Sequence, residues 1–330
     1  MKRRSFLHWG LAASPWPVLG ATKPAAPGAL QWERRTLNAM GTTMALQLAH
    51  ADAAQARRAL DAAVAEIRQV EDLMSLFRSD SALCELNRSG VLHQPHPDLV
   101  DILRTAQSVA QRSNGAFDVT VQPLWLAFAG AQQQGRLPTR QEVQAARQYV
   151  GWRGLQVGAD VIRLARPGMA VTLNGIAQGF AADKVKARLQ AMGIAHALID
   201  AGEWASLGQP AHAGDWTLGL ADPRNAQHLL TGIALQGQCV ATSADDQTSF
   251  SPDFANHHIF DPHTGYSPPY LSCVSVMAPR CVLADALTKV LFMARPQQAL
   301  ALARQWQVEV LVVDKQGRWQ ASPGLPLRPA

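Results

Sequence analysis

TLNGIAQGFAADKVKARLQAMGIAHALIDA, residues 172–201, places a turn, a helix and a strand in immediate succession. Asn174-Gly175 is a turn signal within a helical stretch at 172–192, and Gly193 ends that stretch because glycine readily takes the left-handed conformation found after helices. Apolar residues at 197–201 and again at 205–208 then predict two strands. The segment therefore predicts a helix that leads into neighbouring strands of a sheet.

Helices and strands interleave along the rest of the chain without the regular alternation of a doubly wound sheet. The expected strands are 36–49, 161–164, 216–220, 230–235, 240–242, 272–277 and 308–313, with a short buried segment at 117–121. The expected helices are 52–74, 98–112, 139–149, 281–294 and 297–305. We therefore expect an α+β fold with mixed or antiparallel sheets, in one compact unit.

The N-terminal segment KRRSFLHWGLAAS carries two arginines ahead of an apolar run, and a Pro/Ala/Gly-rich spacer follows it. It resembles a twin-arginine export signal, although a basic arm on a cytoplasmic protein is an alternative. The run contains two prolines and is shorter than the ~20 residues needed to span a bilayer. We expect residues 1–30 to be signal and spacer, with cleavage near Ala21, no lipobox cysteine, a periplasmic location and peripheral or no membrane contact.

The composition, 48% hydrophobic and 17% charged, is ordinary for a globular protein. Without residues 1–21 the chain keeps 27 lysines and arginines against 25 acids, so its formal net charge falls from +5 to +2. No basic stripe with interleaved aromatic residues remains, which argues against nucleic acid as a partner.

The four cysteines, Cys84, Cys239, Cys273 and Cys281, form no C-x-x-C pair and no zinc-binding pattern with histidines. In an exported protein they could form disulfides, with three connectivities possible. Because Cys239 and Cys273 lie in or beside apolar, strand-like runs, buried free thiols are the favoured interpretation.

Four separated segments are rich in small or hydroxyl residues, and three of them add a carboxylate or an imidazole, a combination that suits a phosphate-rich ligand. They are AMGTT (39–43), GAFDVTVQPLW (115–125), TLNGIAQGFAAD (172–183) and HHIFDPHTG (257–265). In the third, Gly175 and Gly179 remove Cβ atoms where the N–H groups of a helix start could meet a pyrophosphate, or they serve only close packing.

The second and fourth segments supply the candidate ring wall and the candidate base. Pro123 and Trp125 suit a wall beside a ring system, unless they simply end a buried strand. In HHIFDPHTG, His257 or His258 could accept a proton from an incoming hydroxyl, with Asp261 orienting the imidazole. Solvated loop histidines are the alternative.

Taken in order, and together with MSLF (74–77) and ADAL (284–287), these segments resemble the ApbE family of FAD:protein FMN transferases over most of residues 36–313. The resemblance implies an ApbE-like, T-fold-like domain at 31–330 that binds FAD as a substrate. It implies transfer of FMN to a Ser/Thr hydroxyl of an exported redox flavoprotein subunit, with AMP released and Mg²⁺ required.

The resemblance also assigns roles to individual residues. His258 and Asp261 become the catalytic candidates. The flavin-nucleotide candidates are Met40, Phe77, Ala116, Phe117, Asp118, Thr172, Gln178 and Ile259. The metal candidates are the Gly175 carbonyl, Asp285 and Thr288.

This chain departs from the family pattern mainly at the phosphate and metal side. The departures are Thr172, Gln178, Glu203, Trp204, Ala244 (in TSADDQTSF, 242–250) and Lys289. Lys289 stands four residues after Asp285, where the family has a metal-binding threonine, so its ammonium group could form a salt bridge that replaces the metal. These changes leave two alternatives to the transferase: a flavin-binding protein without catalysis, and an FAD pyrophosphatase that releases FMN and AMP.

Overall fold

An eight-stranded sheet forms the centre of the computed structural model, which describes residues 29–211 and 214–329. The sheet order is β1-β2-β6-β7-β10-β11-β12-β13, and every neighbouring pair is antiparallel. These strands are β1 (Gln31–Ala39), β2 (Thr42–His50), β6 (His196–Asp200), β7 (Trp204–Leu207), β10 (Cys239–Ala244), β11 (Leu271–Ala278), β12 (Glu309–Asp314) and β13 (Trp319–Ala321). The predicted export signal falls almost entirely outside the described residues.

The middle of this sheet is buried on both faces. Along β12, Val310 and Val312 belong to one apolar cluster, whereas Leu311 and Val313 belong to another. Successive side chains of a strand point to opposite faces, so the run VLVV is buried throughout. This explains why the central strands are continuously apolar rather than alternating with polar residues.

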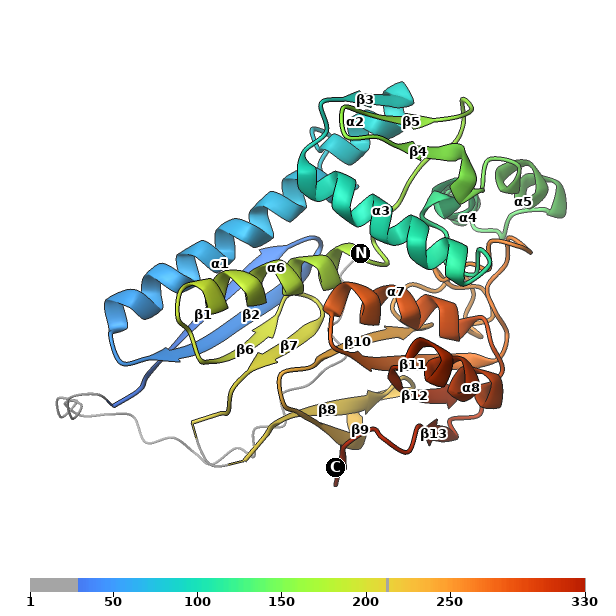
Figure 1. Ribbon diagram of the computed structural model, residues 1–330. Coiled ribbons are helices and arrows are strands. Elements are labelled where there is room, and N and C mark those ends of the chain that lie inside the picture. Colours follow the sequence, from blue (N-terminus) through green and yellow to red (C-terminus); the bar gives the residue numbers. More distant parts are fainter. Residues whose placement is uncertain (1–28, 212–213, 330) are drawn as a thin grey trace.

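Four helices cover one face of the sheet: α1 (Ala53–Met74), α6 (Ala177–Ala191), α7 (Cys281–Phe292) and α8 (Pro296–Trp306) (Figure 1). Asp52 begins α1 by accepting a hydrogen bond from the Ala54 N–H at 2.7 Å. Buried Ala56, Ala59 and Ala63 form a narrow face at helical spacing, which lets α6 approach closely.

A three-stranded sheet covers the other face, in the order β14 (Leu327–Arg328), β9 (Asn225–Leu235) and β8 (Trp216–Asp222). Trp216 and Leu218 of this sheet belong to the same cluster as Trp204 and Val240 of the large sheet. Trp204, one of the departures from the family pattern, therefore fills the space between the two sheets.

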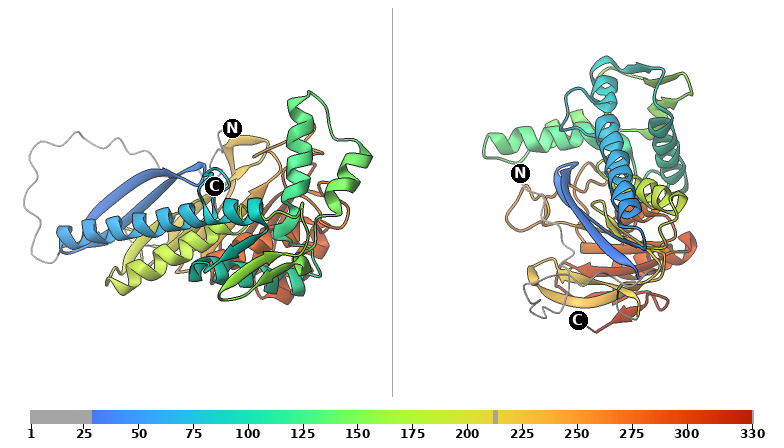
Figure 2. Two further views of the ribbon diagram at one scale, coloured as in Figure 1. Left: turned by 90° about the horizontal axis from the view of Figure 1, so that it is seen from above. Right: turned by 90° about the vertical axis from the view of Figure 1, so that its left-hand side faces the viewer.

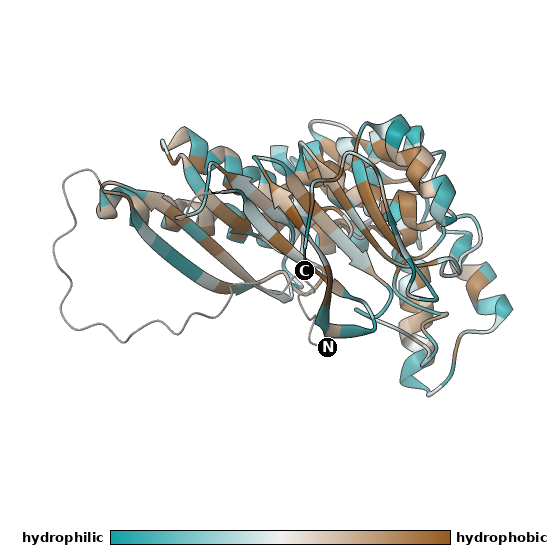
Figure 3. Cartoon of the chain, turned by 90° about the horizontal axis from the view of Figure 1, so that it is seen from below, coloured by the Kyte–Doolittle hydropathy of each residue, from teal (hydrophilic) through white to brown (hydrophobic). Residues whose placement is uncertain are grey.

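The remaining elements surround one end of the molecule. They are α2 (Ala82–Ser89), α3 (Pro97–Arg112), α4 (Gln122–Gln133), α5 (Arg140–Arg147) and a small sheet of β3 (Val91–His93), β5 (Val161–Leu164) and β4 (Leu155–Val157). In Figure 2 the β1–β2 hairpin extends to one end of the molecule, and α4 with α5 lies at the other. Figure 3 shows apolar residues concentrated on the central strands and a hydrophilic stretch along β1.

The α+β architecture with antiparallel sheets is confirmed, but several boundaries differ from those expected. The single strand expected at 36–49 is two strands, because Met40 and Gly41 form a tight turn with φ of 47° and 77°. The helix expected from residue 172 begins at Ala177. Helix α4 was not predicted, and Gln122 and Pro123 occupy its first turn.

Cys239 of β10 and Cys281 of α7 form a disulfide, so the prediction of a free thiol at Cys239 is wrong. The partner lies 42 residues away and meets it only because α7 packs on β10. Cys84 and Cys273 are free, and Cys273 is buried as predicted. Among the described residues, no helix is both long enough and apolar enough to cross a bilayer.

Candidate active site

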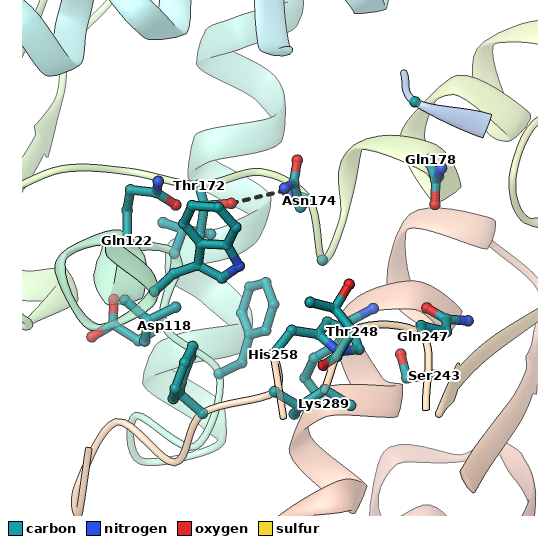
Figure 4. Close-up of a pocket in the computed structure, with 18 of the residues that line it drawn as sticks. Asp118, Gln122, Thr172, Asn174, Gln178, Ser243, Gln247, Thr248, His258 and Lys289 are labelled. Atoms are coloured by element: carbon teal, nitrogen blue, oxygen red, sulfur yellow. Dashed lines mark hydrogen bonds between the residues drawn. The ribbon is translucent and has the colours of Figure 1, made fainter. Parts of the chain in front are cut away.

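A cavity of about 550 Å³ brings the four separated segments together. Its wall includes Gly41 of the β1–β2 turn, residues 116–122, residues 172–178 and residues 258–260, and α7 contributes Lys289. The volume is in the range of small-molecule binding sites. Figure 4 shows Asp118 and Gln122 on one side of this space, and Gln178, Ser243 and Gln247 on the other.

Most of the predicted site residues line this cavity. They are Phe77, Ala116, Phe117, Asp118, Thr172, Gly175, Gln178, His258 and Ile259. Met40 borders a small adjoining hollow together with Phe77 and Gln178. Asp261, Asp285 and Thr288 stand outside the described wall of the main cavity.

Aromatic side chains form part of the cavity wall. Phe117, Trp125 and Phe260 contribute rings, and Phe77 lies at the rim with 67% of its surface exposed. A Cβ atom at Gly41 would lie 3.4 Å from the Phe77 ring, so the turn supports that ring directly. Flat apolar walls of this kind suit a planar ring system.

Asp118 has a structural task in this wall. Its Oδ1 accepts hydrogen bonds from the Thr120 N–H at 2.8 Å and the Thr120 hydroxyl at 2.7 Å, and its Oδ2 accepts one from the Trp152 N–H at 2.8 Å. Burial raises the pKa of Asp118, while these three donors favour its charged form. The carboxylate thus ties the start of α4 to the loop before β4.

Polar side chains form another part of the cavity wall. Asn174, Gln178, Thr242, Ser243 and Gln247 line it, and the Asn174 N–H donates to the Thr172 hydroxyl at 3.3 Å. Gln178 packs on Gly202, where a Cβ atom would lie 2.5 Å from the Gln178 Cδ. A side chain at residue 202 would therefore push Gln178 into the cavity.

Gly179 serves helix packing rather than an anion site. Its N–H donates to the Asp285 Oδ2 at 3.1 Å, so it is already used, and a Cβ atom there would lie 2.3 Å from the Cys281 carbonyl oxygen. The prediction that Gly179 opens a pyrophosphate site at the helix start is therefore wrong. Gly175 does line the cavity.

Lys289 occupies the predicted metal position. Its Nζ lies 2.5 Å from the Asp285 Oδ1 and 3.1 Å from the Asp285 carbonyl oxygen, and its side chain reaches past Gly175. Thr288 is fully buried; its hydroxyl donates to the Asp285 carbonyl at 2.6 Å and pairs with the Ser243 hydroxyl at 2.8 Å.

These residues do not fit a resident Mg²⁺. The ion binds oxygen ligands at about 2.0–2.1 Å, and the Lys289 ammonium already fills the accessible side of the Asp285 carboxylate. The Thr288 hydroxyl lies on the buried face of α7, where it pairs with the Ser243 hydroxyl.

Glu203 is a second buried acid, close to Asp285. It lines the wall, 5% of its surface is exposed, and its Oε2 accepts a hydrogen bond from the Thr242 N–H at 3.1 Å. Burial raises the pKa of Glu203 well above its usual range, and the nearby Asp285 carboxylate raises it further. Burial therefore disfavours the charged form of Glu203.

His258 is the histidine that lines the cavity. Its Nδ1 lies 3.2 Å from the Thr248 carbonyl oxygen, which can only accept a hydrogen bond, so Nδ1 carries the proton. In the neutral ring Nε2 is then the basic nitrogen. His257, by contrast, is fully buried beside Phe292, and burial lowers its pKa to about 3.

Asp261 does not take the orienting position expected for it. The turn at 261–265 directs its carboxylate to His263, whose N–H donates at 2.9 Å and whose Nδ1 lies at 3.2 Å. The Thr248 carbonyl performs the contact with His258 instead.

Several lining residues were not predicted: Val119, Val121, Gln122, Asn174, Thr242, Ser243, Gln247, Thr248 and Phe260. The run TSADDQTSF could have indicated four of them, since five of its nine residues carry hydroxyl or amide groups. Gln122 had none, because the helix that carries it was not expected.

Comparison with known proteins agrees with this geometry. The model of the ApbE family matches residues 40–312. FAD:protein FMN transferase of Salmonella typhimurium is 28% identical over 327 residues, covering 95% of this chain and 91% of its own length. The Treponema pallidum protein of the same name is 30% identical over 299 residues, covering 83% and 82%.

Solved structures show the same fold. The ApbE protein of Thermotoga maritima superposes with a TM-score of 0.79 at 23% identity, covering 89% of this chain and 97% of its own. The Pseudomonas stutzeri flavinyl transferase ApbE, in its apo form, gives 0.78 at 24% identity, with 89% and 95% covered.

Proposed function

The chain belongs to the ApbE family, and from that premise we propose that it transfers FMN from FAD to a Ser or Thr hydroxyl of a target protein. It is a transferase that acts on flavin, like the relatives it matches over most of its length. One observation carries the proposal: a single cavity combines aromatic side chains, polar side chains with an ammonium group, and a histidine positioned as a base.

The aromatic and the polar side chains of the cavity wall match the two chemical parts of FAD. The rings of Phe117, Trp125 and Phe260 suit the isoalloxazine ring. Asn174, Gln178 and Lys289 suit the pyrophosphate because they offer N–H donors and a positive charge. The roles of the individual residues are part of the proposal.

In the proposed step the acceptor oxygen attacks the phosphorus on the FMN side. A new P–O bond forms, the bond from that phosphorus to the bridging oxygen breaks, and AMP leaves with the electron pair of that bond. The proton of the acceptor hydroxyl passes to the His258 Nε2, the basic nitrogen fixed by the Thr248 contact. The protein mainly positions the groups and stabilises charge, as in other phosphoryl transfers.

Magnesium has no step in this proposal, because the residues expected to hold it do not fit the ion. The sequence placed it on the Gly175 carbonyl, Asp285 and Thr288. Those positions surround the Lys289 ammonium group and a hydroxyl that faces Ser243.

We also propose that the protein works in the periplasm on an exported redox flavoprotein subunit. The twin-arginine-like N-terminus motivates this location. The Cys239–Cys281 disulfide is in keeping with it, since such bonds persist in oxidising compartments.

The test is a transfer reaction with the mature chain, FAD and an exported flavoprotein subunit that carries a Ser/Thr acceptor. We expect covalent flavin fluorescence on the acceptor in a denaturing gel and one AMP released for each flavin attached. His258→Gln should abolish labelling while FAD still binds. The control His263→Gln lies in the same segment but outside the cavity wall, and it should remain active.

The other outcomes separate the alternatives. AMP without labelled acceptor would indicate an FAD pyrophosphatase, with water in place of the hydroxyl. Bound FAD with neither product would refute both enzyme functions and leave a flavin-binding protein.

A further inference from the structure

We propose that the Lys289 ammonium group is the built-in cation of this site, and that the chain binds the FAD pyrophosphate without a divalent metal. The inference rests on the proposed function for the identity of the ligand. It concerns this chain's own residues, because Lys289 places a covalently attached positive charge where the family resemblance implies an exchangeable metal ion.

The position of the ammonium group is fixed from three sides. The Asp285 carboxylate holds it at 2.5 Å, and the Asp285 carbonyl accepts a second hydrogen bond from it at 3.1 Å. On the third side a Cβ atom at Gly175 would lie 3.1 Å from the Lys289 Cε, so glycine leaves room for the lysine stem. The group still lines the cavity, with 18% of the side chain exposed.

The acid that holds Lys289 is itself held in place. The Asp285 Oδ2 accepts the Gly179 N–H at 3.1 Å, which leaves Oδ1 for the lysine. Asp183 accepts the Cys281 N–H at 2.7 Å and the Val282 N–H at 3.1 Å, and so anchors the first turn of α7. The helix that carries both Asp285 and Lys289 therefore starts from a fixed point.

The surrounding charges leave the ammonium group available to an anion. Asp285 alone would neutralise Lys289, but this carboxylate also accepts the Gly179 N–H at the positive end of α6. Glu203, the other buried acid near Asp285, is 5% exposed, and this burial disfavours its charged form. The Lys289 ammonium group has three N–H bonds and makes two hydrogen bonds to Asp285, so a pyrophosphate oxygen that enters the cavity can accept the third.

A divalent ion would have to share this space with the ammonium group. An ion at about 2.0–2.1 Å from the Asp285 Oδ1 would lie within a few ångströms of the Lys289 Nζ, where two positive charges repel strongly in a buried setting. Lysine and metal are therefore alternatives at this position.

The test compares FAD with riboflavin, which has the same ring but no phosphate. Equilibrium binding is followed by flavin fluorescence with EDTA present, for the wild type, Lys289→Met, Lys289→Arg and Lys315→Met. Lys315 is the matched control: it is 17% exposed, forms a buried ion pair with Asp245 at 2.7 Å, and lies outside the cavity wall.

We expect the wild type to bind FAD equally well in EDTA and in Mg²⁺. Lys289→Met should weaken FAD binding about 10- to 100-fold, the loss of one charged hydrogen bond, and leave riboflavin binding unchanged. Lys289→Arg should retain most of the FAD affinity. Lys315→Met should leave the ratio of FAD to riboflavin affinity unchanged.

Two results would overturn the inference. In the first, the wild type loses FAD in EDTA and binds it again when Mg²⁺ is added. This measurement uses no variant, so it does not depend on whether a variant folds. The other is a folded Lys289→Met protein with unchanged FAD affinity in EDTA. Because binding is measured directly, a protein that fails to transfer FMN still tests the role of Lys289.

Discussion

Gly179→Ala should destabilise the protein, although alanine is the better helix former. A Cβ atom at residue 179 would lie 2.3 Å from the Cys281 carbonyl oxygen, 2.7 Å from its carbon and 2.8 Å from the Asp285 Cβ. The first contact is roughly 1 Å short of ordinary van der Waals separation, and backbone atoms cannot rotate away as a flexible side chain can. Helices α6 and α7 must therefore move apart.

The magnitude follows from two opposing effects. Overpacking of this kind costs about 1–3 kcal/mol, and the clash with backbone places this site at the upper end. The helix preference of alanine returns up to about 1 kcal/mol. The unfolding entropy of a domain of about 300 residues is roughly 0.6 kcal/mol/K, so the net loss of about 2 kcal/mol should lower the melting temperature by about 3 °C.

Gly130→Ala is the matched control. Gly130 also lies within a helix, α4, but a Cβ atom there would meet nothing within 4 Å. This change should raise the stability by about 0.5–1 kcal/mol. Both variants are measured by urea and thermal unfolding; equal shifts in the two, or a Gly179→Ala protein as stable as the wild type, would refute the packing argument.

Three further predictions concern stability. Burial raises the pKa of Asp200 from 3.8 to about 7, so the contribution of Asp200 to stability is present at low pH and is lost as the pH rises through 7. The variant Asp200→Asn keeps the carbonyl that accepts the Gly202 N–H, and the melting temperature of this variant should exceed that of the wild type at pH 8 but not at pH 5. Burial lowers the pKa of His257 from 6.5 to about 3, so the contribution of His257 to stability is present above pH 6.5 and is lost as the pH falls toward 3. The variant His257→Gln should therefore lose less melting temperature than the wild type as the pH is lowered, and an equal loss in the two proteins would contradict this role of His257. The Cys239–Cys281 bond closes a loop with a sequence separation of 42, and its loss in a Cys239→Ser/Cys281→Ser protein should cost about 4 kcal/mol in urea unfolding, whereas Cys84→Ser should change little.

The sequence was most informative where the local pattern and the tertiary environment agree. Helix α1 was expected at 52–74 and is found at Ala53–Met74, because its apolar positions recur at helical spacing and Asp52 can cap it. Strand β12 was expected at 308–313 because a short, continuous apolar run suits a strand buried on both faces. In both cases neighbouring residues alone carry the signal.

The errors arose where a distant contact sets the outcome. Met40 takes a positive φ that is rare for its type, and the Glu71 carboxylate, 31 residues away, accepts its N–H at 2.6 Å. Helix α4 carries a proline in its first turn, inside an apolar run, so the sequence pattern did not distinguish it from a buried strand.

The candidate site divides in the same way. Residues whose side chains face the cavity could be found either by residue type, as at His258, or through the family resemblance, as at Phe117 and Gln178. Partners could not, because Gly179 meets Asp285 across 106 residues, and Asp261 meets His263 only after the turn has formed. The replacement of a metal position by Lys289 was visible in the sequence, but its geometry was not.

Because of the disulfide between β10 and α7, the properties measured for this protein should depend on how it is prepared. The bond joins the strand of Thr242 and Ser243 to the first residue of the helix that carries Lys289. Recombinant material made in a reducing cytosol would start with these thiols unjoined, whereas material secreted through an oxidising compartment would have them joined. Flavin affinities measured on the two preparations should therefore differ until the thiols are oxidised. The number of free thiols should accordingly be measured for each preparation whose flavin affinity is determined.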